Sequence, residues 1–188
     1  MFGSCAKSSA IWLGALVLAS CGSAEEEMEI GADSIARAQL AAADGTSHGE
    51  VIVAQGDGGL IVRIDATGFA PGPMGVHIHA VGQCDGPDFT SAGGHWNPEG
   101  KQHGFDNPEG VHKGDFVNLD IGPDGTGLLE STIEGTTLKD GSNALLDEDG
   151  AAFVVHEGPD DLVTDPSGNS GRRIACGVFA LQKYTVAD

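Results

Sequence analysis

Short runs rich in Val, Ile, Leu and Phe, each bounded by glycine, proline or aspartate, recur along most of this chain. Strands have this length and composition, and turn residues at both ends stop longer helices from forming. Glycine supplies 30 of the 188 residues, about twice its usual share, without a collagen-like period. We therefore predict an all-β fold, an antiparallel sandwich or barrel of about eight strands with two long functional loops. The later strands are predicted at 50–54, 60–66, 76–80, 116–121, 127–133, 152–157 and 174–181.

The segment 35–41 is compatible with either a helix or a strand. Its composition has helix propensity. Its apolar residues also alternate, however, and the turn signal Asp44-Gly45 follows. We predict that this segment is the first strand.

The N-terminus has the features of an export signal. Lys7 precedes an apolar core at 10–19 that is too short to cross a bilayer as a permanent helix. The next residues, Leu-Ala-Ser-Cys at 18–21, resemble the lipobox of bacterial lipoproteins, whose signal is removed before a cysteine that receives the lipid. The resemblance implies a lipoprotein signal peptide at 1–20 and lipidation of Cys21. It also implies a periplasmic protein in the cell envelope of a Gram-negative-type bacterium, held to the membrane only by its lipid. A plain secretory signal with a chance cysteine is the alternative.

The rest of the chain divides into a short tether and one domain. Residues 21–34 are acidic and lack apolar periodicity, which predicts a flexible tether. Residues 35–188 suit one domain of ordinary size. The net charge of −19 argues against nucleic acid as a partner, because its phosphates would be repelled.

Of the four cysteines, two are accounted for at the N-terminus. Cys5 leaves with the signal peptide, and Cys21 is committed to lipid. Cys84 and Cys176 remain, which allows one disulfide in an oxidising compartment. Two free buried thiols are the alternative.

Six of the seven histidines fall in segments where candidate metal ligands gather. His77 and His79 lie two positions apart in a predicted strand, so both imidazoles project from one face. The strand-poor segment 82–115 carries four more candidates, and a loop this long in a compact domain is functional. Imidazole and carboxylate groups are typical ligands of copper and zinc. The candidate ligands are His77, His79, His95, His103, His112, Asp115 and His156.

The motifs around these residues resemble those of the copper/zinc superoxide dismutases. The resemblance rests on His-Ile-His at 77–79, Gly-Gly-His-Trp-Asn-Pro at 93–98, Val-His-Lys-Gly-Asp at 111–115, Val-His-Glu at 155–157 and Arg-Arg-Ile-Ala-Cys at 172–176. It implies a Greek-key fold with one copper and one zinc ion per subunit. The implied copper ligands are His77, His79, His95 and His156. The implied zinc ligands are His95, His103, His112 and Asp115, so that His95 bridges the two metals.

The resemblance also assigns a residue outside the ligand set. Asp160 stands four residues after His156, where the family has an aspartate that links a copper-site histidine to a zinc-site histidine. Here it would link His77 to His103, fixing their tautomers and raising their basicity. Asp161, the next residue, is the alternative.

An arginine near the C-terminus receives its role in the same way. Arg173 precedes Cys176 by three residues, which matches the arginine at the mouth of the copper channel. Its permanent charge suits docking of a small anion beside the metal. Arg172 is the neighbouring alternative, and His48 matches no ligand.

The implied activity is dismutation of superoxide to dioxygen and hydrogen peroxide, which would protect the cell envelope from oxidative damage. Arg173 would dock superoxide, and His95 would supply a proton. A periplasmic copper/zinc-binding or storage module on the same fold is the alternative, but it would not need the channel arginine. The zinc-type ligands argue against a copper-only dismutase, and the mutual pairing of the two mature cysteines argues against a Cys/His hydrolase.

One departure from the eukaryotic pattern leaves the oligomeric state open. Cys84 follows His79 by only five residues. This spacing resembles the bacterial branch of the family, whose members differ in their dimer interface and are sometimes monomeric. Both a monomer and a homodimer therefore fit the sequence.

Overall fold

The computed structural model describes residues 34–182, in which the regular elements are strands and one short 3₁₀ helix. The strands are β1 (Ile35–Ala41), β2 (Ser47–Gln55), β3 (Gly59–Thr67), β4 (Gly72–Met74), β5 (Val76–His79), β6 (Leu119–Ile121), β7 (Thr126–Glu134), β8 (Ala152–His156), β9 (Arg173–Val178) and β10 (Ala180–Leu181), and the helix is η1 (Thr90–Ala92). Within this range no helix is long and apolar enough to span a membrane. The predicted signal peptide, Cys21 and all but the last residue of the predicted tether lie outside the described residues.

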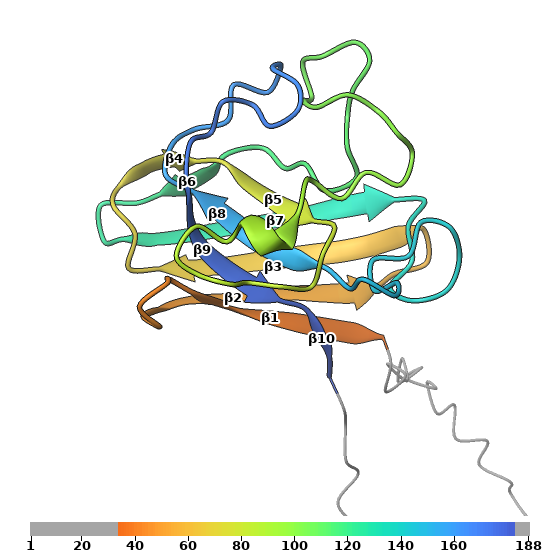
Figure 1. The fold of residues 1–188 in the computed structure, drawn as a ribbon, viewed down its shortest axis with the longest axis horizontal. Coiled ribbons are helices and arrows are strands. Elements are labelled where there is room, and N and C mark those ends of the chain that lie inside the picture. The colour runs from red at the N-terminus through yellow and green to blue at the C-terminus, as the bar shows by residue number, and fades with distance from the viewer. Residues whose placement is uncertain (1–33, 183–188) are drawn as a thin grey trace, which may run out of the picture.

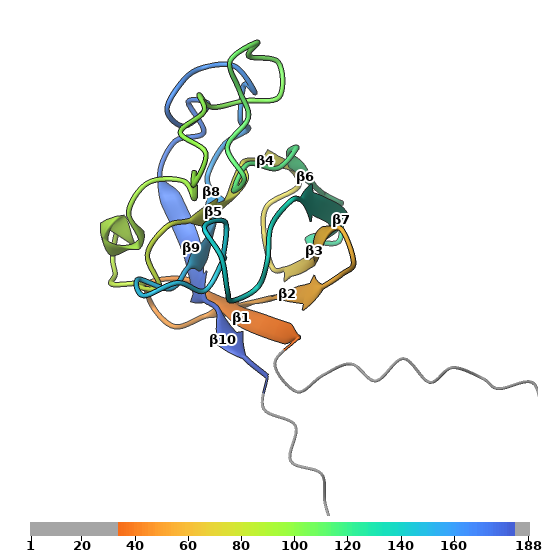
Figure 2. The same cartoon turned by 90° about the vertical axis from the view of Figure 1, so that its right-hand side faces the viewer.

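Eight strands form one curled antiparallel sheet (Figures 1 and 2). Its order is β5-β8-β9-β1-β2-β3-β7, with β10 also paired to β1, while β4 and β6 form a separate pair. The strands β1 to β3 are sequential neighbours, whereas β8 returns to lie between β5 and β9, which is a Greek-key connection. The predicted all-β antiparallel fold is confirmed. The strand predicted at 174–181 is divided into β9 and β10, the one at 116–121 is shortened to β6, and β4 was missed.

The strand interpretation of segment 35–41 is confirmed, and the helix alternative is wrong. Ala36, Ala38 and Leu40 are completely buried, so burial follows a period of two. The segment pairs with β2 along most of its length. Tertiary pairing and burial of alternate residues therefore outweigh the local helix propensity.

All four residues of strand β5 are buried, as are all five of the neighbouring β8. Val76 and Ile78 belong to the main apolar core. His77 and His79 point to the opposite face, where long loops cover them. A strand that is buried on both faces can thus present two imidazoles away from bulk water.

Two long loops rise together from one end of the barrel (Figure 1). They span 80–118 and 157–172, and the first is close to the strand-poor segment predicted at 82–115. Backbone N–H of Asp106 donates to the carbonyl of Leu162 at 2.9 Å, and the Asn107 amide donates to the carbonyl of Val163 at 3.2 Å. These contacts bind one loop to the other.

A third long loop, at 135–151, was not predicted. It places Leu138 and Leu145 in the main core, where they are almost completely buried. Its apolar residues are separated by Gly, Asp and Asn and follow no strand or helix period, so no sequence pattern marks it as a core element.

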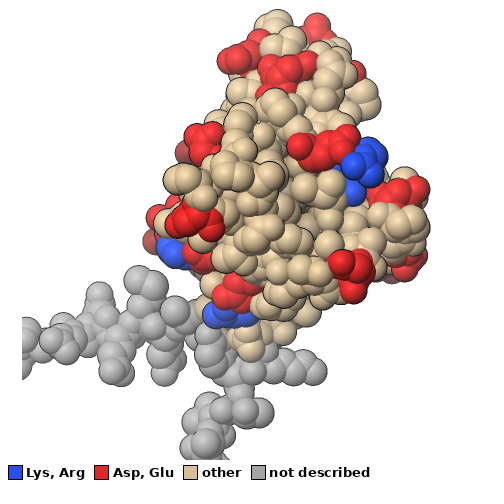
Figure 3. Space-filling model, turned by 90° about the vertical axis from the view of Figure 1, so that its left-hand side faces the viewer, with Lys and Arg blue, Asp and Glu red and all other residues tan. Residues whose placement is uncertain are grey.

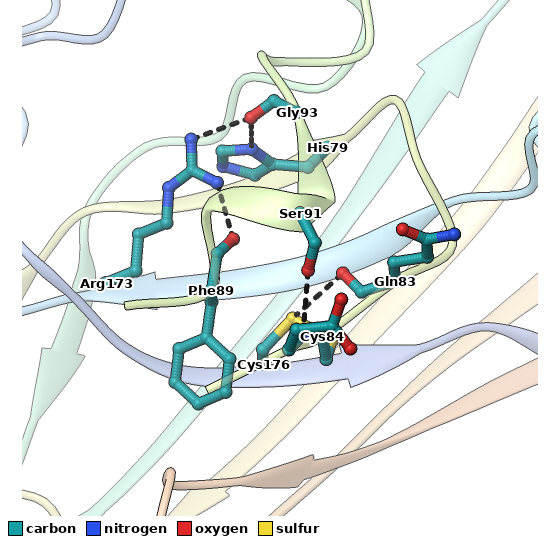
Figure 4. Close-up of a disulfide and its surroundings, with 9 residues drawn as sticks. His79, Gln83, Cys84, Phe89, Ser91, Gly93, Arg173 and Cys176 are labelled. Carbon is teal, nitrogen blue, oxygen red and sulfur yellow. Dashed lines mark hydrogen bonds between the residues drawn. A yellow bond between two sulfur atoms is a disulfide. The ribbon is translucent and has the colours of Figure 1, made fainter. Parts of the chain in front are cut away.

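Cys84 and Cys176 form the predicted disulfide, with their Cα atoms 5.7 Å apart. The bond joins the loop before η1 to β9 (Figure 4). Beneath it Phe89, Ala92 and Val154 form a small apolar cluster of their own. The free-thiol alternative is therefore wrong.

We expect this disulfide to contribute strongly to stability, because it closes a loop across 92 positions. The chain-entropy treatment gives a stabilisation of about 4.5 kcal/mol for a loop of this length. Urea unfolding of the Cys84→Ser/Cys176→Ser variant should show a loss of this order relative to the oxidised protein. A double variant within about 0.5 kcal/mol of the parent would contradict the expectation.

Candidate metal centre

The structure brings all seven candidate ligands into one buried cluster. Strand β5, the loop 80–118 and the end of β8 supply them. Two overlapping groups have ligand atoms close enough to hold a metal ion: His77, His79, His95 and His156 in one, and His77, His95, His103 and Asp115 in the other. The rings of His77 and His95 stack with centroids 3.9 Å apart, at the junction of the two groups.

Four ring nitrogens in the cluster are buried and have no hydrogen-bond partner: His77 Nδ1, His79 Nε2, His95 Nε2 and His156 Nε2. A fifth, His103 Nδ1, is buried and has only the carboxylate of Asp115 beside it, at 3.1 Å. A buried polar atom without a partner costs about 1–3 kcal/mol, and nearly all buried polar atoms in proteins have partners. The four partnerless nitrogens belong to the four histidines of the first group, whose ligand atoms lie within 4.8 Å of one another, and they therefore indicate a bound ligand that accepts nitrogen lone pairs. A metal ion fits this requirement.

In three rings the nitrogen other than the partnerless one makes a hydrogen bond. This bond holds the ring and so fixes the direction in which the partnerless nitrogen points. His79 Nδ1 donates to the carbonyl of Gly93 at 2.9 Å, and His156 Nδ1 donates to the carbonyl of Gly171 at 3.1 Å. His77 Nε2 donates to Asp160 Oδ2 at 2.6 Å. Because a carbonyl oxygen only accepts, the inner nitrogen of a neutral His79 or His156 carries a lone pair. The first group is thus set up as a site of imidazole nitrogens, which suits copper.

Asp115 organises the second group. Its Oδ1 lies 2.8 Å from His95 Nδ1, 3.1 Å from His103 Nδ1 and 3.2 Å from His112 Nδ1. Its Oδ2 accepts the backbone N–H groups of Gly104 and His112. The nitrogens of His95, His103 and His112 together with one Asp115 oxygen would match a tetrahedral zinc site, whose bonds of about 2.0–2.1 Å place the ligand atoms about 3.3 Å apart. His112 lies beside the second group rather than in it, so its role as a ligand stays a prediction.

His95 is the residue that faces both groups. Its Nδ1 points to Asp115, and its Nε2 is one of the four nitrogens without a partner. His77 also belongs to both groups, but its Nε2 is occupied by Asp160, which leaves only one nitrogen for a metal. His95 is therefore suited to bridge two ions.

The carboxylate of Asp160 connects the two groups by hydrogen bonds to one histidine of each. It accepts from His77 Nε2 at 2.6 Å and from His103 Nε2 at 3.0 Å, the two histidines that the sequence analysis names. Two hydrogen bonds to Asn118 hold the Asp160 backbone in place. Asp161 instead accepts from its own loop and is exposed, so it does not reach the cluster.

The protonation states suit metal binding in the first group. Burial lowers the pKa of His77 to about 3 and that of His156 to about 4, and it holds the pKa of His79 well below its usual value. These rings are neutral at pH 7 and can donate lone pairs without first losing a proton.

In the second group the carboxylates of Asp115 and Asp160 change the protonation states. Burial raises the pKa of Asp115, but hydrogen bonds from His103, His112 and His95 outweigh this effect and hold it far below its usual value. Burial alone would lower the pKa of His103, yet hydrogen bonds to Asp115 and Asp160 raise it to about 9. Zinc would therefore displace a proton from His103 as it binds.

A pocket of about 490 Å³ opens beside the first group. His79, His95 and His156 line it together with Arg173. The Arg173 guanidinium donates to the carbonyls of Phe89 and Gly93, each at 2.7 Å (Figure 4). The Gly93 carbonyl thus orients both Arg173 and His79.

The neighbouring arginine has a different environment. Arg172 forms an ion pair with Glu157 at 2.8 Å, and its side chain is 81% exposed. His48 stacks on Phe69 instead of joining the cluster. The structure therefore distinguishes Arg173 from Arg172 and separates His48 from the other histidines.

The groups that orient the ligands were not predicted from the sequence. The carbonyls of Gly93, Gly171 and Phe89, and the side chain of Asn118, have no motif of their own. Every residue has a carbonyl, so only the folded chain shows which ones face a ring. Asn118 could have been suspected only as a polar residue within a predicted strand.

The fold and the cluster define a β-barrel protein with candidate sites for two metal ions that share a histidine. Residues 47–179 match the family described as copper/zinc superoxide dismutase (SODC). The chain belongs to this family.

Named relatives and a solved structure agree with this membership. The chain is 39% identical over 175 residues to "Superoxide dismutase [Cu-Zn] 2" of Aquifex aeolicus, covering 92% of this chain and 98% of that protein. It is 47% identical over 144 residues to "Superoxide dismutase-like protein YojM" of Bacillus subtilis, covering 75% and 74%. The crystal structure of a SOD-like protein from Bacillus subtilis superposes with a TM-score of 0.72 at 44% identity, covering 76% of this chain and 96% of that chain.

The buried histidines predict an acid-sensitive metal-free protein. Unfolded histidine titrates near pH 6.5, whereas folded His77 and His156 titrate near 3 and 4, so the unfolded state binds more protons between these values. Stability should fall as the pH drops from 6.5 to 4, by up to about 1.4 kcal/mol per pH unit for each histidine. His103 acts in the opposite sense, since its stabilisation is complete below pH 6.5 and is lost as the pH rises through 9.

Urea unfolding of the chelator-treated protein at pH 7, 6 and 5 measures this dependence, with the metal-loaded protein as the reference. A metal-free protein whose free energy of unfolding is the same at pH 7, 6 and 5 would show that the rings are not buried as neutral groups.

Proposed function

We propose that this protein catalyses the dismutation of superoxide to dioxygen and hydrogen peroxide, at a copper ion bridged to zinc by His95. The observation that carries the proposal is the set of four partnerless buried nitrogens in the first group, beside a pocket that Arg173 also lines. Membership of the copper/zinc superoxide dismutase family supports the general activity. The reaction consumes two superoxide anions and two protons for each dioxygen and each peroxide formed.

Each set of residues has a separate task. We assign His77, His79, His95 and His156 to copper, and His95, His103, His112 and Asp115 to zinc, one ion of each per subunit. Bound copper would supply the one-electron oxidation and reduction of superoxide. The carbonyls of Gly93 and Gly171 would hold the copper ligands in one tautomer, and Asp160 would do so for both groups.

Arg173 would dock the anionic substrate. Two carbonyls fix its guanidinium, and Arg173 lines the same pocket as His79, His95 and His156. A fork of donors held beside a metal binds a small anion without reorganising. His95, whose Nδ1 lies beside Asp115 and whose Nε2 has no partner, would deliver a proton to reduced oxygen in the pocket.

The overall charge of −19 would repel superoxide, so local charge must dominate at the pocket. At physiological ionic strength the screening length is about 8 Å. Carboxylates far from the pocket are largely screened at this distance, whereas Arg173 acts at contact range. Field focusing of this kind accounts for fast capture of charged substrates; superoxide dismutase is one of the standard cases.

This proposal predicts unequal effects of the two arginines. The protein loaded with copper and zinc should dismutate superoxide, and Arg173→Glu should lower kcat/KM by about tenfold or more without removing copper. Arg172→Glu should have a much smaller effect, because Arg172 is exposed and paired with Glu157. Pulse radiolysis gives the rates, and metal analysis gives the copper content.

A loaded protein that binds both metals but has no dismutase activity would support the copper/zinc-binding or storage module instead. A rate that rises with added salt would show that global repulsion controls the encounter, and the docking role of Arg173 would be wrong.

We further propose that the mature protein is lipid-anchored through Cys21, faces the periplasm and protects the cell envelope from oxidative damage. The lipobox-like residues 18–21 and the following acidic segment support this location. Cys21→Ser should abolish lipid labelling and either release soluble protein or leave the precursor uncut, with the activity of the folded domain intact. Absence of label on the parent protein in a bacterial host that acylates lipoproteins would contradict the anchor.

A further inference from the structure

A second pocket, of about 130 Å³, also reaches the buried cluster. This smaller pocket lies between the loop 80–118 and the last residues of β7. His112 and Asp115, two of the four proposed zinc ligands, line it, and none of the proposed copper ligands is among its described lining residues. The smaller pocket therefore adjoins the zinc ligands without adjoining the copper ligands.

His112 is the proposed zinc ligand that is most accessible to solvent. Its side chain is 6% exposed, whereas those of His95, His103 and Asp115 are 3%, 0% and 1% exposed. An ion that enters through the smaller pocket would therefore meet His112 before it reaches the deeper ligands.

The larger pocket, of about 490 Å³, is the less favourable route for a divalent cation. Arg173 lines it, and the permanent positive charge of this side chain repels cations. An ion in the larger pocket would also meet His79 and His156, whose buried neutral rings offer lone pairs for a competing site. Zinc that entered there would have to pass the first group of histidines.

The charge at the smaller pocket is more favourable for cations. Lys113 lines it, but its ammonium group pairs with Glu99 at 3.1 Å and donates to the carbonyl of Glu134 at 3.0 Å. The exposed Glu134 and the buried Asp115 contribute negative charge. On the face in Figure 3 acidic groups are also more numerous than basic ones, in keeping with the net charge of −19. An acidic surface raises the local concentration of divalent cations.

Phe105 is an exposed part of the wall of the smaller pocket. It is 49% exposed, yet the backbone on both sides of it is fixed. The Gly104 N–H donates to Asp115 Oδ2 at 3.1 Å, and the Asp106 N–H donates to the carbonyl of Leu162 at 2.9 Å. Exposed side chains change rotamer rapidly, so the ring can rotate away from the pocket without a movement of the loop.

We propose that the smaller pocket is an entry site for a divalent cation, through which zinc reaches and leaves its ligands, and that Phe105 gates this site by rotation of its side chain. This inference rests on the proposed assignment of zinc. A gate changes the barrier between the free and the bound state but changes neither state. Its removal therefore alters the rates of uptake and release by the same factor and leaves the affinity unchanged, whereas the loss of a side chain that positions a ligand alters the affinity.

The test measures zinc release from the copper- and zinc-loaded protein to a coloured chelator, and zinc uptake by the same protein after its zinc has been removed. Phe105→Ala should raise both rates by about threefold or more, with an unchanged dissociation constant for zinc and an unchanged copper content. Val163→Ala is the matched control, because Val163 is 48% exposed on the neighbouring loop but lines neither pocket.

A pair of serine substitutions tests the route itself. Ser131 lines the smaller pocket, and Ser167 lines the larger one. Ser131→Leu should slow uptake and release by about threefold or more, because the added methyl groups fill the smaller pocket, whereas Ser167→Leu should leave both rates unchanged.

Three results would overturn the inference. They are Ser131→Leu with the rates of the parent, Phe105→Ala with the rates of Val163→Ala, and a change in the dissociation constant that accounts for the whole effect of Phe105→Ala. A parent protein that binds no zinc would instead overturn the proposed assignment of zinc.

Discussion

The carboxylate of Asp160 joins the strand that carries His77 to the loop that carries His103, and both candidate metal sites depend on this connection. It is 4% exposed and accepts from one ring on each side. A buried carboxylate is stable only when its hydrogen bonds are complete, and here two imidazoles and the Leu162 N–H provide them. Gly168 is required behind it, because a Cβ at that position would overlap the carboxylate. Each group of ligands is therefore positioned through a carboxylate that also holds a ligand of the other group.

Strand pairing, the disulfide and one loop carbonyl fix the positions of the other site residues. Strand β5 fixes His77 and His79 by pairing with β8, which itself ends at His156. The disulfide then fastens the loop 80–118 to β9, the strand that begins with Arg173. Within that loop the Gly93 carbonyl accepts from both Arg173 and His79 (Figure 4). Arg173 and His79 thus share one backbone acceptor, so the position of the loop sets the positions of both side chains.

Much of the fold and of the ligand set could be predicted because both leave periodic or ordered signals. Alternating apolar residues in segments such as 35–41 indicate strands, and the order of the histidines indicates the family. The loop 135–151 and strand β4 could not be predicted, since their burial follows from tertiary contacts rather than from a period. The orienting carbonyls and the Asn118 contact with Asp160 join segments far apart in sequence, and no local pattern specifies them. The choice of Arg173 over Arg172 followed from spacing alone, and the structure supplies its physical reason in the Glu157 ion pair.

Anomalous diffraction from crystals of the metal-loaded protein, recorded at the copper and zinc absorption edges, can show whether His95 bridges two metal ions. We predict two peaks on opposite sides of the His95 ring. The copper peak should contact His79 Nε2, His156 Nε2 and His77 Nδ1, and the zinc peak should contact His103 Nδ1 and Asp115 at about 2.0–2.2 Å. A single peak, or two peaks of which neither contacts His95, would contradict the account.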